Sequence, residues 1–82
     1  MSPVHWASLY GTLDALRILV QKGGNPDKLN TLGSSAVHLS AGAGHLNCLV
    51  FLTNYGCNVY AINDNGATPM QEAIGHGKVG NF

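Results

Sequence analysis

The sequence predicts an all-α solenoid of about two and a half helix-turn-helix repeats, and three observations support this fold class. Residues 35–58 read as one complete unit, in which a short apolar segment halts at glycines and a second apolar stripe at helical spacing ends at Gly56. Helix-end glycines recur every 33 positions, at Gly11, Gly44 and Gly77. The apolar stripe keeps the same interval, at Leu13, Leu46 and Val79. Such short helices are not stable alone, so neighbouring units must cover one another.

The interval divides the chain into a partial repeat over residues 1–29, a complete repeat over 30–62 and a second partial repeat over 63–82. The first unit opens on Ser2 and Pro3, which suit a helix cap and a first helical turn. We expect its inner helix over 4–10 and its outer helix over 13–22. Gly23 should end the outer helix in the left-handed conformation, which glycine adopts without a steric penalty.

The connections between units should be projecting turns. Residues 27–34 are expected to reverse the chain, with a positive φ at Gly33. The turn repeats at 63–66, an inner helix then runs to about His76, and 78–82 begin an outer helix without completing it. We therefore expect either an excerpt from a longer array, or a domain whose apolar ends are covered by another copy of the chain. Self-association through the uncapped ends is one of the alternatives that the sequence leaves open.

Each unit opens on a similar tetrapeptide: Ser2-Pro3-Val4-His5, Ser35-Ala36-Val37-His38 and Thr68-Pro69-Met70-Gln71. A 33-residue repeat of a turn and two helices with such an opening resembles the ankyrin-repeat family. The resemblance covers essentially the whole chain. The run from Gly23 to Lys28 further resembles ankyrin and SAM-domain scaffolds of the Usher protein network and their epithelial relative, although this chain has no SAM domain.

Composition excludes several other classes of protein. Only 10% of the 82 residues are charged and the net charge is zero, so the chain lacks the basic patch that nucleic acid or an anionic membrane would attract. It has no apolar run of about 20 residues and no signal peptide, so we expect no membrane insertion and a cytoplasmic location. Cys48 and Cys57 are expected to be reduced and to act as small apolar fillers.

The residues with catalytic or metal-binding chemistry do not form a site. His5 and His38 share one repeat position, which should separate them by roughly 10 Å, too far for one zinc ion. The motif Gly42-Ala43-Gly44 follows a helix rather than a strand, so it does not predict a dinucleotide site. We therefore expect no enzyme activity, no cofactor and no metal, and structural roles for the histidines.

The resemblance implies a non-enzymatic protein-binding module of a scaffold or adaptor protein, which contacts its partner through turn tips and inner helices. Transferred position by position, the binding residues are Trp6, Leu9, Tyr10, Leu29, Thr31, Leu32, Ser34, Ala43, Ile62, Asp64, Asn65, Ala67 and His76, with Leu39 and Gly42 on the same face. The alternative is a structural spacer, in which the same apolar residues are buried against flanking repeats and contact no partner.

Overall fold

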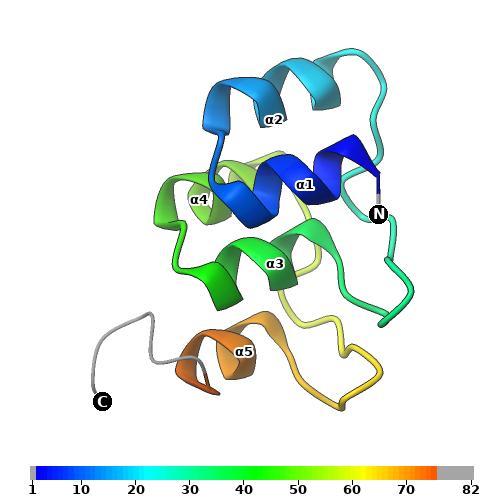
Figure 1. Ribbon diagram of the computed structural model, residues 1–82, viewed down its shortest axis with the longest axis vertical. Coiled ribbons are helices and arrows are strands. Elements are labelled where there is room, and N and C mark those ends of the chain that lie inside the picture. Colours follow the sequence, from blue (N-terminus) through cyan, green and yellow to red (C-terminus); the bar gives the residue numbers. More distant parts are fainter. Residues whose placement is uncertain (1, 76–82) are drawn as a thin grey trace.

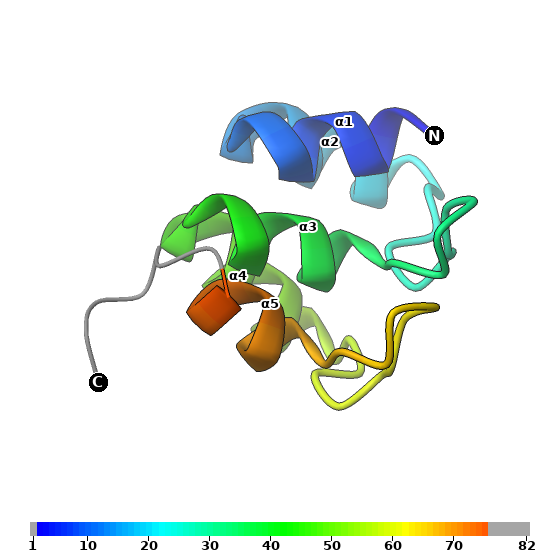
Figure 2. The same ribbon diagram turned by 60° about the horizontal axis from the view of Figure 1, so that its bottom comes forward.

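The computed structural model describes residues 2–75, which form helices and, over that range, no strand (Figure 1). The inner helices are α1 (Pro3–Tyr10), α3 (Ala36–Ala43) and α5 (Pro69–Gly75), and the outer helices are α2 (Leu13–Gln21) and α4 (Leu46–Tyr55). Figure 1 shows α1, α3 and α5 stacked along the long axis, with α4 behind α1 and α3. The other outer helix, α2, is at the top in that view and lies behind α1 in Figure 2, so α2 and α4 form a second layer. The predicted all-α solenoid is confirmed.

The helix ends agree closely with the sequence prediction. The helices predicted over 4–10 and 13–22 run from Pro3 to Tyr10 and from Leu13 to Gln21. Gly23 and Gly33 have the expected positive φ, 99° and 72°. The inner helix of the third unit is described over Pro69–Gly75. His76 and the outer helix expected to begin at 78–82 lie outside the described residues.

The recurring tetrapeptide caps each inner helix. The Ser2 N–H donates to Nδ1 of His5 at 3.1 Å, and the serine hydroxyl lies 2.8 Å from the same nitrogen. Ser35 and His38 repeat both contacts at 3.2 and 3.0 Å. In each case the histidine three residues after the cap serine accepts the backbone N–H of that serine, a group that the helix itself leaves unpaired.

The third unit makes the same cap with different chemistry. The Thr68 N–H donates to Oε1 of Gln71 at 2.8 Å, and the Gln71 N–H donates to the Thr68 hydroxyl at 3.3 Å. Gln71 is exposed, whereas the histidines of the first two units are buried.

The core lies between the inner and outer layers. Leu16 of α2 and Leu52 of α4 are fully buried in one cluster with apolar residues of α1 and α3. Equal spacing does not give equal burial: Val4 and Val37 are buried, but Met70, at the same repeat position, is 57% exposed. Met70 lines the open end of the stack, where no further unit lies against it within residues 2–75.

Two long turns, between α2 and α3 and between α4 and α5, project to the same side of the stack (Figure 2). In the first of these turns, Oδ1 of Asn30 accepts the N–H groups of Leu32 at 2.9 Å and Ser34 at 3.0 Å. This asparagine therefore holds the reversal that the sequence predicts.

Candidate protein-binding face

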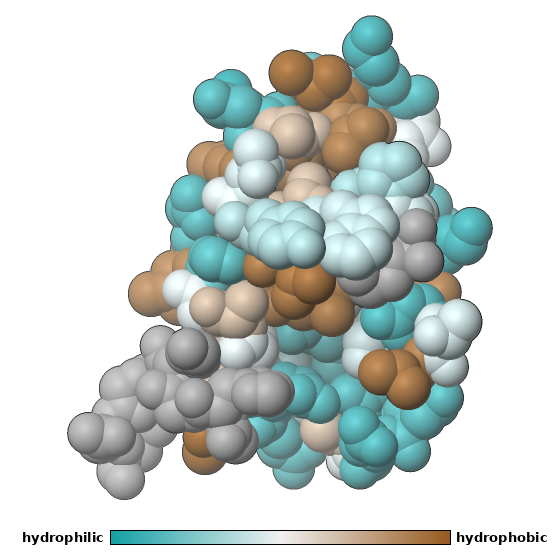
Figure 3. Space-filling model, in the orientation of Figure 1, coloured by the Kyte–Doolittle hydropathy of each residue, from teal (hydrophilic) through white to brown (hydrophobic). Residues whose placement is uncertain are grey.

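The inner helices present one surface, which we call the inner face, lined by Trp6, Leu9, Tyr10, Leu39, Ala43 and Glu72. Figure 3 shows this side of the molecule, with a pale band across the middle of the stack, a brown apolar patch just below that band and teal hydrophilic surface in the uncovered part further down. The inner face is therefore mixed, with an apolar centre and a polar edge.

An aromatic pair stands on α1. The rings of Trp6 and Tyr10 are stacked, with centroids 5.6 Å apart and planes 9° from parallel. The pair arises because residues four apart lie on one face of a helix. Although the rings contact each other, Trp6 is 46% exposed and Tyr10 68% exposed. Two rings held in this way lose little conformational freedom on binding, as in the aromatic anchors of many interfaces.

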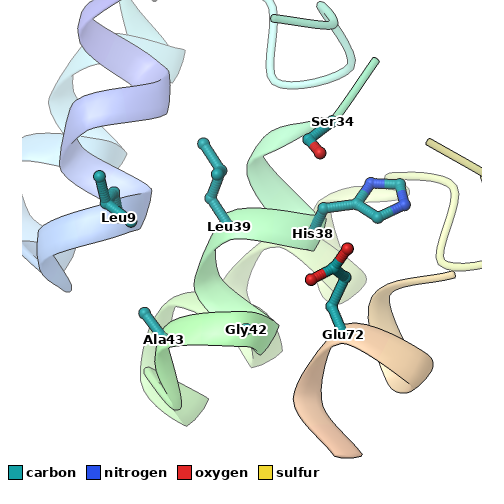
Figure 4. Close-up of a pocket in the computed structure, with 7 residues that line it drawn as sticks. All are labelled: Leu9, Ser34, His38, Leu39, Gly42, Ala43 and Glu72. Carbon is teal, nitrogen blue, oxygen red and sulfur yellow. The ribbon is translucent and has the colours of Figure 1, made fainter. Parts of the chain in front are cut away.

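A groove of about 280 Å³ is lined by residues of α1, α3 and α5 and by the end of the first long turn (Figure 4). Its apolar wall comes from α1 and α3. Its polar end comes from Ser34 at the end of the first long turn, His38 of α3 and Glu72 of α5. The lining residues are Leu9, Ser34, His38, Leu39, Gly42, Ala43 and Glu72. Sites for drug-sized ligands usually measure about 300–1,000 Å³, so the groove suits side chains of a protein better than a cofactor.

A buried amide organises the polar end of the groove. Asn63 is 6% exposed, and its Nδ2 donates to Oε1 of Glu72 at 2.7 Å and to the Ser34 hydroxyl at 3.3 Å. Its Oδ1 accepts the N–H groups of Asn65 and Ala67, each at 3.0 Å. Asn63 thus joins the two turns to α5 and fixes the position of the Glu72 carboxylate.

The tips of the two turns also meet. The Asp64 N–H donates to the Leu32 carbonyl at 3.0 Å. Apolar side chains beside this contact remain exposed: Leu29, Leu32 and Ile62 each expose more than half of their surface. The turn tips therefore form a second exposed group at the edge of the inner face.

The structure divides the residues predicted from the sequence between these two groups. Trp6, Leu9, Tyr10 and Ala43 lie on the inner face, and Leu29, Thr31, Leu32, Ile62, Asp64, Asn65 and Ala67 lie in the turns. Ser34 differs from the expectation of a surface contact, since it is only 7% exposed and bonds Asn63. His76 lies outside the described residues.

Two residues of the site, Asn63 and Glu72, were not predicted. The recurrence of asparagine 33 residues after Asn30 marks a turn, but it does not reveal the bond to α5. Glu72 is the only acidic residue in the three inner helices of the described chain. That single acid was a usable signal, because a charged residue on a packing helix calls for an explanation.

The histidines join neighbouring segments, as expected of structural residues. Nε2 of each ring lies at hydrogen-bond distance from a backbone carbonyl: His5 to Lys28 at 2.7 Å, His38 to Ala67 at 3.0 Å and His45 to Leu9 at 2.9 Å. His5 and His38 are almost fully buried, and both ring nitrogens are engaged within the protein. Over residues 2–75, no three potential metal ligands of the His, Cys, Asp or Glu type are grouped together.

Both cysteines are buried thiols. Burial raises the pKa of Cys48, and burial together with the neighbouring Asp27 raises the pKa of Cys57 to about 11. Each is therefore protonated at neutral pH, which makes a poor nucleophile and a good apolar filler.

A second groove, which we call the end groove, lies at the end of the stack and measures about 390 Å³. Its mainly apolar lining includes Leu49, Thr53, Val59, Met70 and Ala73. Leu49 and Thr53 follow Leu16 and Val20 by 33 residues, and those two are buried in the hydrophobic core. The end groove thus leaves accessible, one unit further along, positions that are buried in the first unit.

Over residues 2–75, no helix has both the length and the apolar character needed to cross a bilayer.

Comparison with known proteins identifies the repeat. The profile of the family described as ankyrin repeats, in three copies, matches residues 4–81. Mouse synphilin-1 is 36% identical over 80 residues, and human palmitoyltransferase ZDHHC17 is 33% identical over 66. These matches cover 93% and 79% of this chain but only 8% and 10% of those proteins.

The fold matches a solved structure as well. The crystal structure of the human ASB11 ankyrin repeat domain superimposes with a TM-score of 0.90 and 32% identity, over 96% of this chain and 36% of that one. These relatives do not support the narrower resemblance to the ankyrin and SAM-domain scaffold SANS. They do establish the repeat type, and ankyrin repeats are generally protein-protein interaction modules without catalytic activity of their own. With its 33-residue units, capped inner helices and projecting turns, this chain belongs to the ankyrin-repeat family.

Proposed function

We propose that this chain binds a protein partner through its inner face and turn tips, as part of a cytoplasmic scaffold or adaptor protein. The observation that carries the proposal is the stacked pair of Trp6 and Tyr10, which stays exposed on α1, the helix whose Leu9 lines the groove. Exposed aromatic residues next to an apolar hollow are typical of binding hot spots.

The middle unit argues against a pure spacer. Trp6 and Tyr10 correspond, 33 residues later, to Leu39 and Ala43 of α3. Helix α3 is packed between α1 and α5, yet Leu39 and Ala43 remain partly exposed and line the groove. A repeat stacked on each side therefore leaves these positions accessible, and a repeat added before α1 would leave Trp6 and Tyr10 accessible too.

The units that we propose are residues 1–29, 30–62 and 63–82. The turn hydrogen bonds support these boundaries. The Asn30 N–H donates to the Ser34 carbonyl at 2.8 Å, and the Asn63 N–H donates to the Ala67 carbonyl at 3.0 Å, so each proposed boundary opens on the same closed turn.

Random-peptide display on the immobilised chain tests the function, with fluorescence polarisation to measure the affinity of each selected peptide. Tyr10→Glu should weaken binding about tenfold or more, because truncating an aromatic anchor commonly removes 1–2 kcal/mol or more. Leu32→Glu tests the turn tips in the same way. Tyr55→Glu is the matched control, since Tyr55 also ends a helix, is 57% exposed and contacts an aromatic ring, but lies in the outer layer.

The outcomes separate the two readings. Weaker binding by Tyr10→Glu with an unchanged helical spectrum and melting temperature supports the interface, provided that Tyr55→Glu binds normally. If the display selects no peptide, or if Tyr10→Glu unfolds the chain while Tyr55→Glu does not, the spacer is favoured.

The end groove supports a second candidate, self-association of the array. Its lining is mainly apolar, and Met70 is 57% exposed there. Light scattering over a range of concentrations tests this candidate. A dimer that Met70→Glu abolishes supports it, and a monomer at all concentrations contradicts it.

A further inference from the structure

We propose that Asn65 is a site of non-enzymatic deamidation, which the closed turn over Asn63–Gly66 restrains and an opened turn permits. Asn65 precedes Gly66, and this is the only Asn-Gly pair in the chain. Glycine has no β-carbon to hinder attack by its backbone nitrogen on the preceding side chain, so this pair favours the reaction. The inference concerns a modification of the turn and does not rest on the proposed partner binding.

The reaction requires only these two residues and water. Hydroxide takes the proton from the backbone nitrogen of Gly66, that nitrogen bonds to Cγ of Asn65, and the Cγ–Nδ2 bond breaks. Nδ2 takes a proton from water and leaves as ammonia, which regenerates the hydroxide. Water then opens the succinimide ring at either carbonyl. The product is aspartate, or isoaspartate, in which the main chain runs through the former side-chain carbonyl, and either product adds a negative charge.

Solvent reaches the reacting pair. Asn65 and Gly66 are both exposed, and a β-carbon added at Gly66 would meet no atom within 4 Å. Asn58 is also exposed, and its Oδ1 accepts the Tyr60 N–H at 2.9 Å. Val59 follows Asn58, however, and its branched side chain hinders ring closure. Asn58 is therefore an internal control with similar exposure and a different following residue.

The closed turn holds the attacking nitrogen away from Cγ. The Gly66 N–H donates to the Asn63 carbonyl at 2.9 Å, and over residues 2–75 only glycines have a positive φ. A turn with this bond and a negative φ at both central residues is type I, in which ψ of the second one, here Asn65, is about 0°. The Gly66 nitrogen then eclipses the Asn65 nitrogen, whereas ring closure requires it to eclipse Cβ. The turn must therefore open before Asn65 reacts.

The first long turn shows that this position does not require asparagine. The turn over Asn30–Gly33 closes through the same backbone bond as the turn over Asn63–Gly66, at 3.0 and 2.9 Å. Leu32 stands there in place of Asn65. A closed turn thus forms with a different side chain at this position, so we expect Asn65→Asp to preserve the turn.

Isoaspartate should instead disrupt the turn, because it adds a carbon to the main chain between Asn65 and Gly66. The hydrogen bonds that span this point fix both of its sides. Oδ1 of Asn63 accepts the N–H groups of Asn65 and Ala67, each at 3.0 Å, and the Asn63 N–H donates to the Ala67 carbonyl at 3.0 Å. A longer main chain displaces one side from the other, so the junction between this turn and α5 should loosen.

Peptide mapping of the full chain by mass spectrometry tests the proposal. The chain is incubated at mildly alkaline pH in native buffer and in urea that unfolds it, and conversion of Asn65 and Asn58 is followed over time. A synthetic peptide over 60–70, kept in both solutions, measures the effect of urea on the reaction itself. Asn63→Ala removes the Oδ1 acceptor from the turn, and circular dichroism verifies that this variant keeps its helices.

We expect the unfolded chain to convert Asn65 and to leave Asn58 intact. The native chain should convert Asn65 about tenfold more slowly or less, because only the fraction of molecules with an open turn reacts. Asn63→Ala should speed the reaction in native buffer. The isoaspartyl form, purified by chromatography, should unfold at a lower urea concentration than the unmodified chain, whereas Asn65→Asp should unfold near the unmodified midpoint.

Each part of the proposal has its own contrary result. If the unfolded chain converts Asn65 no faster than Asn58, Asn65 is not a deamidation site. Equal rates in the native and unfolded chains, after correction with the peptide, would show that the turn does not restrain the reaction, and this comparison decides even if Asn63→Ala unfolds. Equal midpoints for the isoaspartyl form and Asn65→Asp would overturn the link to α5. None of these results depends on partner binding, which the peptide display decides separately.

Discussion

A β-carbon added at Gly11 would lie 2.5 Å from Nδ1 of His45. The His45 ring lies against the end of α1, where its Nε2 is 2.9 Å from the Leu9 carbonyl. Gly11 itself has a φ of 73°. One glycine thus ends the inner helix and leaves space for the histidine that joins the first unit to the second.

Gly11→Ala should therefore lower the free energy of unfolding by more than its backbone conformation alone would require. Gly66 is the matched control, with a φ of 77° and no atom within 4 Å of an added β-carbon. We expect Gly66→Ala to cost about 1–2 kcal/mol, the penalty of the left-handed conformation, and Gly11→Ala to cost about 1–3 kcal/mol more through displacement of His45. Urea unfolding measures both; equal losses would show that the ring moves aside freely.

His38→Ala should destabilise the chain by about 2–3 kcal/mol. The substitution removes the cap on α3 and leaves the Ser35 N–H and the Ala67 carbonyl without the partner they have in the protein. His38→Gln should lose less, since Gln71 shows that glutamine makes the capping bond at this repeat position. A loss by His38→Gln as large as that by His38→Ala would show that the bond to the next turn, and not the cap, dominates.

Asn63→Asp should destabilise the junction between the turns and α5. The aspartate keeps the oxygen that accepts the N–H groups of Asn65 and Ala67, but it replaces the donor to Glu72 with a second carboxylate. We expect a loss of about 2–4 kcal/mol at neutral pH. In a double-mutant cycle, Glu72→Gln should recover part of that loss, because it removes the repulsion. Strictly additive losses would contradict direct coupling between the two residues.

Alkaline pH should destabilise the protein through Cys57. Its pKa in the folded chain is raised to about 11 from an ordinary value of 9.0, so the unfolded chain releases the thiol proton first. The contribution to stability is fully present below pH 9 and is lost as the pH rises towards 11. Cys57→Ala lacks this contribution, so the difference in urea midpoint between the two proteins should shrink or reverse over that range. A difference independent of pH would contradict the raised pKa.

The local features of the fold were predictable because they depend on neighbouring residues. Serine or threonine before each inner helix and glycine after it specify helix ends whatever the helix packs against. The same reasoning located the projecting turns, since Gly33 must adopt a positive φ. The aromatic pair followed from helical periodicity, which places Trp6 and Tyr10 on one face.

The polar end of the site was not predictable in this way. Ser34 is buried because Asn63, 29 residues later, donates to its hydroxyl. Glu72 lies in the groove because the same asparagine holds its carboxylate. No local pattern reports contacts between residues so far apart in the chain.

The sequence by itself determined the 33-residue unit, the ends of its helices and the positions of its turns, because capping, glycine conformation and helical periodicity act within a few residues. Only the tertiary structure decided which copy of each repeated residue is buried. Val37 and Met70 occupy equivalent positions, yet one is covered and the other exposed. Burial in a solenoid depends on the unit stacked alongside, and that neighbour is not encoded in the residue itself.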